Sequence, residues 1–250
     1  MARSIIAIAL AAALSGCFTI GDADEPITTI TVPAPAPNDT PEAVIVLPGF
    51  GDSASRMQDR GFAEAVQRAW PQVDVVLTNT TFAYYNRGVL VPRLEQDVMA
   101  PALKRYKKLW LAGASMGGSG TLLYEHEHEG QMQGLLLFAP FLGDKDLLEE
   151  VRAAGGVTKW DPGPRPDALS ADNWQRELWR VLKARAGNPV LAKRTWLICG
   201  KEDKLLAASR LASEALPASQ YFEVEGGHKW EAWSKAAEAT LPRIRASGTP

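Results

Sequence analysis

Short apolar runs alternate with longer amphipathic segments along most of this chain, from residue 43 to near its end. Each run is rich in Val, Leu, Ile or aromatic residues, which is typical of strands buried on both faces. Six strands are predicted in this way, at residues 43–47, 73–78, 108–112, 134–138, 195–199 and 220–224. The segments between them favour helices at residues 54–70, 90–106, 116–129, 171–186, 205–216 and 230–246.

Strands that alternate with helices predict an α/β domain, here over residues 42–248, with a mostly parallel sheet of about six strands and helices on both faces. Such a sheet places its functional residues at the carboxyl ends of the strands. A long insertion at residues 144–192, after the fourth strand, interrupts the alternation. Two interpretations of it stay open: a small lid beside the site, or a decorated crossover whose tryptophans belong to the core.

The first residues of the chain have the pattern of an export signal. Arg3 precedes an apolar stretch at residues 5–14, which is too short to span a bilayer of about 30 Å. Leu14-Ser15-Gly16-Cys17 follows and resembles a bacterial lipobox. We therefore expect residues 1–16 to be removed and Cys17 to carry a lipid anchor. An ordinary secretory signal that happens to contain a cysteine is the alternative.

The residue after the lipobox indicates to which membrane a bacterial lipoprotein is sorted. Phe18, rather than Asp, follows Cys17, and in enteric bacteria the absence of Asp there resembles outer-membrane sorting. We expect a lipid-anchored protein of the bacterial cell envelope, at the outer membrane. Residues 17–41 are predicted to be a tether, because prolines alternate at residues 32–37 and favour extended polyproline II. A short edge strand at residues 27–31 is the alternative.

Composition narrows the class of protein further. The chain has 250 residues, a formal net charge of −2 and 46% hydrophobic residues. A nucleic-acid binder would usually carry a strong basic excess, so we expect no nucleic-acid partner. The two cysteines, Cys17 and Cys199, cannot form a disulfide framework. Cys199 lies in an apolar strand, which predicts a buried, inert thiol.

The strongest chemical signal is a serine turn. Gly113-Ala114-Ser115-Met116-Gly117 directly follows the strand predicted at 108–112 and opens a helix, which is the context that the G-x-S-x-G pattern requires. The glycines let the strand and helix approach each other around an exposed serine. The Met116 N–H lies at the helix N-terminus, where it can stabilise a developing oxyanion. Ser115 is therefore the predicted nucleophile.

A nucleophilic serine needs a base, and the chain has only three histidines. His126 and His128 lie more than ten residues along the helix from Ser115, roughly 15 Å away, and are predicted to belong to a solvated, charged helix end. Their spacing puts them on different helix faces, which argues against a metal pair. His228 follows the last strand after two glycines, at the same sheet edge as Ser115, and is the predicted base.

The base in turn needs a carboxylate that orients it. Asp203 follows the fifth predicted strand and is the preferred candidate. Its neighbour Glu202 is one alternative, and Asp144 and Asp146 after the fourth strand are another.

The chain order Ser115, Asp203, His228 and the context of each residue resemble the α/β-hydrolase family. The resemblance covers about residues 43–246 and implies a three-layer fold, although no predicted strand corresponds to the family's first two. It also implies a second oxyanion N–H after the first predicted strand, at Phe50 or, as the nearby alternative, Gly51. Residues 227–233 resemble the histidine turn of some carboxylesterases.

The resemblance implies a serine esterase that works through an acyl-enzyme and needs no metal or cofactor. The partner is then a small-molecule or lipid ester. Aromatic residues near the proposed site favour an apolar acyl or alkoxy group. The candidate pocket residues are Gly51, Tyr84, Phe141, Trp160 and Trp230.

Three rival functions stay open. The triad could transfer its acyl group to an acceptor other than water, or cleave an amide. The chain could also be a non-catalytic binding lipoprotein on a hydrolase fold. Finally, residues 49–54 match G-x-G-x-x-A, the dinucleotide-binding pattern. The next predicted strand ends Leu77-Thr78-Asn79 without the acidic residue that holds a ribose, which argues against this last interpretation.

Overall fold

A computed structural model describes residues 21–248 of the chain. Within them, seven strands form one sheet in the order β1-β3-β2-β4-β5-β6-β7, parallel except for β1, which pairs with β3 antiparallel. The strands are β1 Thr29–Val32, β2 Glu42–Leu47, β3 Asp74–Thr78, β4 Lys108–Ala114, β5 Gly134–Phe138, β6 Thr195–Gly200 and β7 Tyr221–Val224. All six predicted strands are confirmed, and β1 is added to them.

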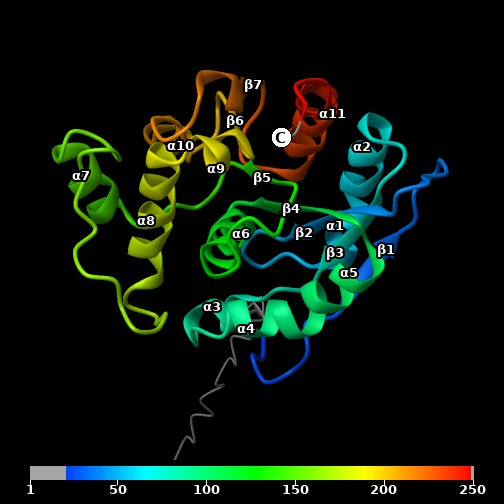
Figure 1. Cartoon of the computed structure of the whole chain (residues 1–250), viewed down its shortest axis with the longest axis horizontal. Helices are drawn as coiled ribbons and strands as arrows, with labels where there is room; N and C mark the ends of the chain where they lie inside the picture. Colours follow the sequence, from blue (N-terminus) through cyan, green and yellow to red (C-terminus); the bar gives the residue numbers. More distant parts are fainter. Residues whose placement is uncertain (1–20, 249–250) are drawn as a thin grey trace, which may run out of the picture.

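Helices cover both faces of the sheet (Figure 1). On one face, α1, α2 and α11 pack over a core that includes Trp110, Phe138 and Trp196. On the other face, α3 to α8 and α10 enclose a second core. The helices are α1 Ala54–Asp59, α2 Phe62–Ala69, α3 Phe82–Asn86, α4 Leu90–Leu94, α5 Ala100–Arg105, α6 Met116–Glu127, α7 Lys145–Ala153, α8 Trp174–Gly187, α9 Pro189–Lys193, α10 Leu206–Ser213 and α11 Trp230–Ala246. This is the three-layer α/β arrangement that was predicted.

Two predicted helices are interrupted. The helix expected at residues 54–70 is divided into α1 and α2 at Gly61, whose φ of 70° is in the left-handed region that favours glycine. The helix expected at residues 90–106 contains a π-helical turn, η1 Glu95–Met99, between α4 and α5. A single 3₁₀ turn, η2 Ala218–Gln220, precedes β7.

The N-terminal segment differs from the tether that was expected up to residue 41. β1 pairs with β3, and Ala23 and Ile27 are buried against the domain. The Ile27 N–H donates a hydrogen bond of 2.9 Å to Asp97 Oδ2. Of the two interpretations, the edge strand is therefore the one observed, and a strand does precede the first predicted one. The predicted signal at residues 1–16 and the lipid site Cys17 lie outside the described residues.

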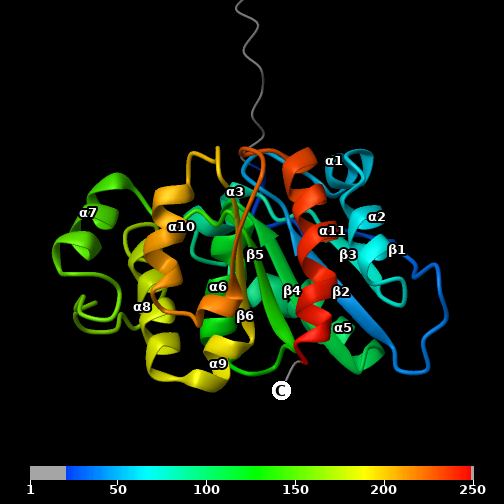
Figure 2. The same cartoon turned by 90° about the horizontal axis from the view of Figure 1, so that it is seen from above.

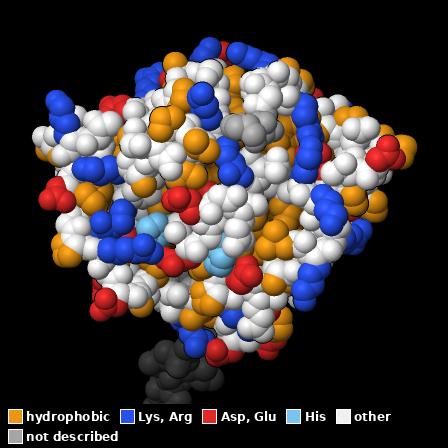
Figure 3. Space-filling view, viewed as in Figure 1, with side chains coloured by type: hydrophobic (Ala, Val, Ile, Leu, Met, Phe, Trp, Pro, Cys, Tyr) orange, Lys and Arg blue, Asp and Glu red, His pale blue; other side chains and the backbone are white. Residues whose placement is uncertain are grey.

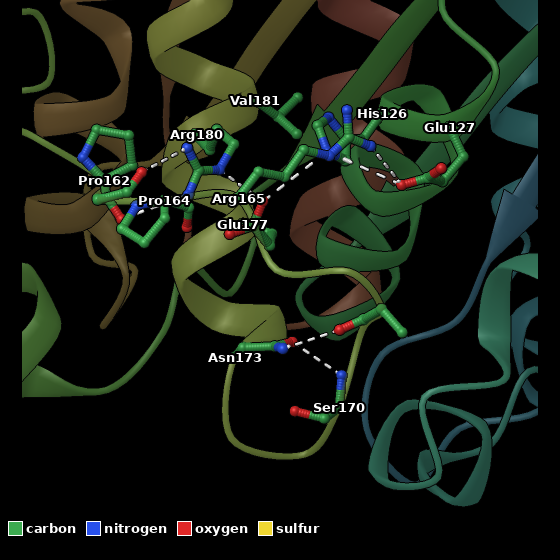
Figure 4. Close-up of polar contacts among 12 residues, drawn as sticks. His126, Glu127, Pro162, Pro164, Arg165, Ser170, Asn173, Glu177, Arg180 and Val181 are labelled. Atoms are coloured by element: carbon green, nitrogen blue, oxygen red, sulfur yellow. Dashed lines mark hydrogen bonds and ion pairs between the residues drawn. The ribbon is translucent and has the colours of Figure 1, made fainter.

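The insertion at residues 144–192 packs as part of the domain. Trp160, Trp174 and Trp179 are buried in the same core as α6. Arg180 on α8 donates hydrogen bonds to the carbonyl oxygens of Pro162, Gly163 and Pro164 and pairs with Glu177 (Figure 4). This packing favours the decorated crossover over the lid.

Charges of both signs are interspersed on the molecular face drawn in Figure 3. None of the helices in residues 21–248 has the length and apolar character that crossing a membrane requires.

Candidate active site

Ser115 occupies a strained turn between β4 and α6. Its φ of 53° and ψ of −117° lie outside the regions that a residue with a side chain normally adopts. Two backbone hydrogen bonds of 2.9 Å hold this conformation, one from the Ser115 N–H to the Phe138 carbonyl and one from the Phe141 N–H to the Ser115 carbonyl. The end of β5 and the loop that follows it therefore fix the serine backbone from both sides.

The glycines around Ser115 are required by close approach. A Cβ on Gly113 would lie 2.2 Å from the Gly117 carbonyl carbon, and one on Gly117 would lie 2.1 Å from the Leu47 carbonyl oxygen. Neither distance is sterically possible for a side chain. The pattern noticed in the sequence thus lets α6 cross directly over the ends of β2 and β4.

Ser115, His228 and Asp203 form a continuous line of short polar contacts. The Ser115 Oγ lies 2.9 Å from His228 Nε2, and His228 Nδ1 lies 2.9 Å from each carboxylate oxygen of Asp203. The Asp203 carboxylate is fully shielded from solvent and also accepts a hydrogen bond of 2.8 Å from the Leu205 N–H. The structure thus brings together the three residues that were predicted from separate parts of the sequence.

The loop that carries His228 is held by glycines and an aromatic ring. A Cβ on Gly200 would lie 2.0 Å from the Gly226 carbonyl oxygen, so only glycine lets the β6 and β7 loops meet. The Trp233 ring contacts the His228 ring edge-to-face, with centroids 4.9 Å apart. These contacts fix the imidazole between its two partners.

The alternative carboxylates have other partners. Glu202 accepts a hydrogen bond of 2.7 Å from the Gly226 N–H, so it supports the histidine loop without contacting the ring. Asp144 caps the N-terminus of α7 by accepting the Leu147 N–H. Asp146 lies in the first turn of α7.

Met116 and Phe50, the two residues expected to supply the oxyanion donors, both lie near Ser115. Met116 is the first residue of α6, and its carbonyl accepts a hydrogen bond of 3.0 Å from the Tyr85 hydroxyl. Gly49 lies so close that a Cβ on it would be 3.6 Å from Ser115 Cβ. Phe50 follows Gly49 and lines the same hollow as Ser115.

That hollow has a volume of about 310 Å³. Trp230 lines it as predicted, and its indole N–H donates a hydrogen bond of 2.9 Å to Asp52. This bond joins the loop after β2 to the start of α11. The remaining lining residues are Gly49, Phe50, Arg60, Ser115, Lys204, His228, Lys229, Glu231 and Trp233. The hollow is therefore more polar than the apolar pocket that was expected.

The other four predicted pocket residues do not line this hollow. Gly51 and Tyr84 line a neighbouring hollow, and the Tyr84 hydroxyl donates to the Glu25 carbonyl. Phe141 packs against Trp174. Trp160 is buried in the core and donates its indole N–H to Glu150, so its assignment to the pocket is wrong.

The sequence did not indicate six of the lining residues: Asp52, Arg60, Lys204, Lys229, Glu231 and Trp233. Lys229, Glu231 and Trp233 lie within the histidine-turn motif at residues 227–233, which was the one available signal for them. Asp52, Arg60 and Lys204 gave no signal as lining residues, because exposed charges at loop ends resemble ordinary solvated positions.

The remaining histidines and the second cysteine have structural surroundings. His126 on α6 is mostly buried against the insertion (Figure 4), and the His128 ring stacks on Tyr124. The expectation of a solvated, charged helix end is therefore wrong for these two rings. Burial raises the pKa of the Cys199 thiol to about 11, which agrees with the predicted inert cysteine. In the described part of the chain, no cluster of three His, Cys, Asp or Glu side chains is placed to hold a metal ion.

Several solved structures share the fold of this chain. The chain is similar to Est1E from Butyrivibrio proteoclasticus, at 17% identity and a TM-score of 0.60 over 88% of this chain and 95% of that one. It is similar to an S-formylglutathione hydrolase from Staphylococcus aureus at 14% identity, with a TM-score of 0.59 over 88% and 99% of the two chains. A monoacylglycerol lipase from Paleococcus ferrophilus aligns at 16% identity, with a TM-score of 0.55 over 88% and 100%.

These likenesses identify the α/β-hydrolase fold. A search of curated proteins found no match. The model of a family described as "Putative esterase" matches residues 36–244, which include Ser115, Asp203 and His228. The chain therefore belongs to this esterase family.

Proposed function

We propose that this protein is a serine carboxylesterase that works through Ser115, His228 and Asp203. The observation that carries the proposal is the line of 2.9 Å contacts from Asp203 through His228 to the Ser115 hydroxyl. A protein that only binds a ligand does not need a buried carboxylate in contact with a histidine that in turn contacts a strained serine. Family membership supports the same reaction class.

The first step is acylation. His228 Nε2 takes the proton of the Ser115 hydroxyl as Oγ attacks the ester carbonyl carbon. Asp203 accepts the Nδ1–H of His228, which fixes the tautomer and stabilises the imidazolium. The proton then passes from Nε2 to the departing alkoxide, so the alcohol leaves and an acyl-serine remains.

The second step is deacylation by water. His228 accepts a proton from the water molecule as it attacks the acyl carbonyl, and returns it to Ser115 Oγ when the acid leaves. In both steps the backbone N–H groups of Met116 and Phe50 are the proposed oxyanion donors. The loss of one such donor typically costs about 3 kcal/mol of transition-state stabilisation.

Hydrolysis of p-nitrophenyl esters from acetate to palmitate, by the parent and Ser115→Ala side by side, tests the proposal. We expect activity in the parent and a loss of at least about a thousandfold in the variant. Equal rates in both proteins would contradict the role of Ser115. Product analysis with added alcohols or amines separates hydrolysis from acyl transfer, and matching anilides test amide cleavage.

We also propose that Cys17 is lipidated and anchors the enzyme to a bacterial envelope membrane, the outer membrane being our proposed location. The lipobox-like Leu14-Ser15-Gly16-Cys17 supports this. Mass spectrometry of the N-terminal peptide tests it, with Cys17→Ser as the control. We expect a diacylglyceryl-sized mass increase on Cys17 in the parent, and release of Cys17→Ser from the membrane fraction.

A further inference from the structure

The chain enters the described domain beside the catalytic residues. Asp22 lines a hollow of about 510 Å³, whose lining also includes Asp52. Asp52 lines the Ser115 hollow as well, so the two hollows adjoin. Gly21 packs against Thr81 at the start of α3. Figure 2 shows α1, α3 and the start of α11 where the parallel strands end, and α9 at the opposite side, where the strands begin.

The residues that follow Asp22 are bound to the domain. Asp24 forms an ion pair of 2.8 Å with Arg87. The Glu25 carbonyl accepts a hydrogen bond of 2.8 Å from Tyr84, and Ile27 is buried. β1 then pairs with β3. These contacts hold the entry point beside the carboxyl ends of the strands, where Ser115 and His228 lie; we call this side of the domain the catalytic edge. The segment therefore cannot serve as a long tether.

The covalent distance to the proposed anchor is consequently short. Asp22 follows Cys17 by five residues, and five fully extended residues span at most about 18 Å. A free tether from Cys17 to residue 41 would have reached about 85 Å by the same measure. The shorter limit, about 18 Å rather than about 85 Å, therefore sets how far the catalytic edge can move from a membrane that holds Cys17.

Three side chains that line the Ser115 hollow suit a lipid–water interface, and they lie beside the acidic Asp52 and Glu231. Phe50 is 50% exposed at the mouth of the Ser115 hollow. Lys204 and Lys229 are exposed at the same mouth. Lysines are attracted to anionic headgroups, and exposed apolar rings such as that of Phe enter the boundary between headgroups and acyl chains. Val190, another exposed large hydrophobic residue, lies on α9 at the other edge.

We propose that the catalytic edge faces the membrane that carries the anchor, and that the substrate is an ester held in that bilayer or at its surface. The proposal rests on the proposed lipidation of Cys17 and on the proposed esterase activity. The bound entry segment, the 18 Å limit and the exposed Phe50 all place the Ser115 hollow close to lipid rather than out in the surrounding water.

Energy transfer to the membrane tests the orientation. The mature lipidated chain is placed in vesicles of phosphatidylethanolamine and phosphatidylglycerol that carry acceptor-labelled headgroups. Donor dyes are attached at Lys204→Cys, at the catalytic mouth, or at Val190→Cys, at the opposite edge. Cys199 is 1% exposed and does not compete for label under native conditions. We expect a much larger loss of donor fluorescence at 204 than at 190.

Two results would overturn the proposal: equal or reversed losses at the two positions, or a chain that does not remain with the vesicles. Insertion of twenty Gly and Ser residues after Phe18 adds a flexible segment of about 25 Å. We expect this insertion to reduce the difference between the two donors. An unchanged difference would show that the short tether does not set the orientation.

The same vesicles test the substrate class. Hydrolysis of a long-chain ester dissolved in the bilayer is compared with hydrolysis of p-nitrophenyl acetate in the surrounding buffer. We expect the Gly-Ser insertion to lower only the first rate. If the insertion lowers neither rate, the proposed bilayer substrate is contradicted. Absence of both activities in the parent contradicts the proposed esterase instead, while the donor measurement still reports the orientation.

Discussion

At the scale of single residues, the site depends on a strained serine held by backbone contacts. A positive φ on a residue with a side chain costs roughly 1–3 kcal/mol, and it persists only where the surroundings impose it. Here the last residue of β5 accepts a hydrogen bond from the Ser115 N–H, and Phe141 in the following loop donates one to the Ser115 carbonyl. The glycines that surround Ser115 are thus part of the catalytic geometry as well as of the fold.

Gly117→Ala tests this dependence. Its Cβ would lie 2.1 Å from the Leu47 carbonyl oxygen, which belongs to rigid strand backbone. We expect a loss of about 2 kcal/mol or more in the free energy of unfolding, measured in urea, together with loss of esterase activity. Gly187→Ala is the control, because a Cβ there meets nothing within 4 Å at the end of α8. A similar loss in both variants would contradict the steric argument.

The two adjacent acids after β6 make a second matched pair. Asp203→Asn removes the charge behind His228 and favours the wrong tautomer, so we expect kcat to fall by about 10⁴-fold. Glu202→Gln keeps an oxygen that accepts the Gly226 N–H, and we expect its kcat to stay within about threefold of the parent's. Steady-state kinetics with one p-nitrophenyl ester measures both. Comparable losses would mean that the histidine loop, rather than the triad carboxylate, governs the rate.

Residues of the triad could be predicted because each lies in a local pattern: a strand, a turn and a helix around Ser115, and strand ends before Asp203 and His228. The pocket could not be predicted in the same way. Trp160 and Phe141 come from loops whose direction depends on packing, and the structure directs both toward the tryptophan-rich core. The Asp52 contact with Trp230 joins residues far apart in the sequence, and no local pattern predicts it.

At the scale of elements, the main surprise is the N-terminal segment. Its alternating prolines indicated an extended tether, but Pro33, Pro35 and Pro37 all follow the paired residues of β1. These prolines do not prevent pairing, because they lie beyond the residues of β1 that pair with β3. The four residues of β1 are also too few to give a clear alternating pattern.

Ile27→Ala measures how firmly this segment is bound. The side chain is 4% exposed, so its truncation should lower the free energy of unfolding by about 2–4 kcal/mol. Ile30→Ala, at a half-buried position of β1, should cost clearly less. Thermal or urea unfolding of both variants gives the comparison. A free tether would instead leave the stability of the Ile27 variant unchanged.

At the scale of the whole molecule, the insertion is joined to the helix that begins at the nucleophile. The Trp179 indole donates to the Leu142 carbonyl, and Arg185 lies 3.7 Å from Glu125 of α6 in the core. The alternation of strands and helices predicted the layers of the fold. The same alternation could not predict which face of the insertion would be buried, because no strand lies between α7, α8 and α9 to set their direction.

His126 lies at this junction, and it makes the junction sensitive to pH. Burial is the main cause that lowers the pKa of His126 below its usual 6.5; Arg165 and Arg180 add to it, while Glu127 and Glu177 oppose it. In the unfolded chain the imidazole binds a proton near pH 6.5, whereas the folded chain binds it only at lower pH. Stability from this group is therefore complete above pH 6.5 and is lost as the pH falls.

His126→Gln replaces the imidazole with an amide that does not titrate. The fall in the free energy of unfolding between pH 7 and pH 5 should therefore be smaller in this variant than in the parent. Urea unfolding at several pH values measures it, and His128→Gln gives the background change for a histidine on the same helix. An unchanged slope in His126→Gln would mean that carboxylates alone govern the acid sensitivity, and that His126 accepts its proton as readily in the folded chain as in the unfolded one.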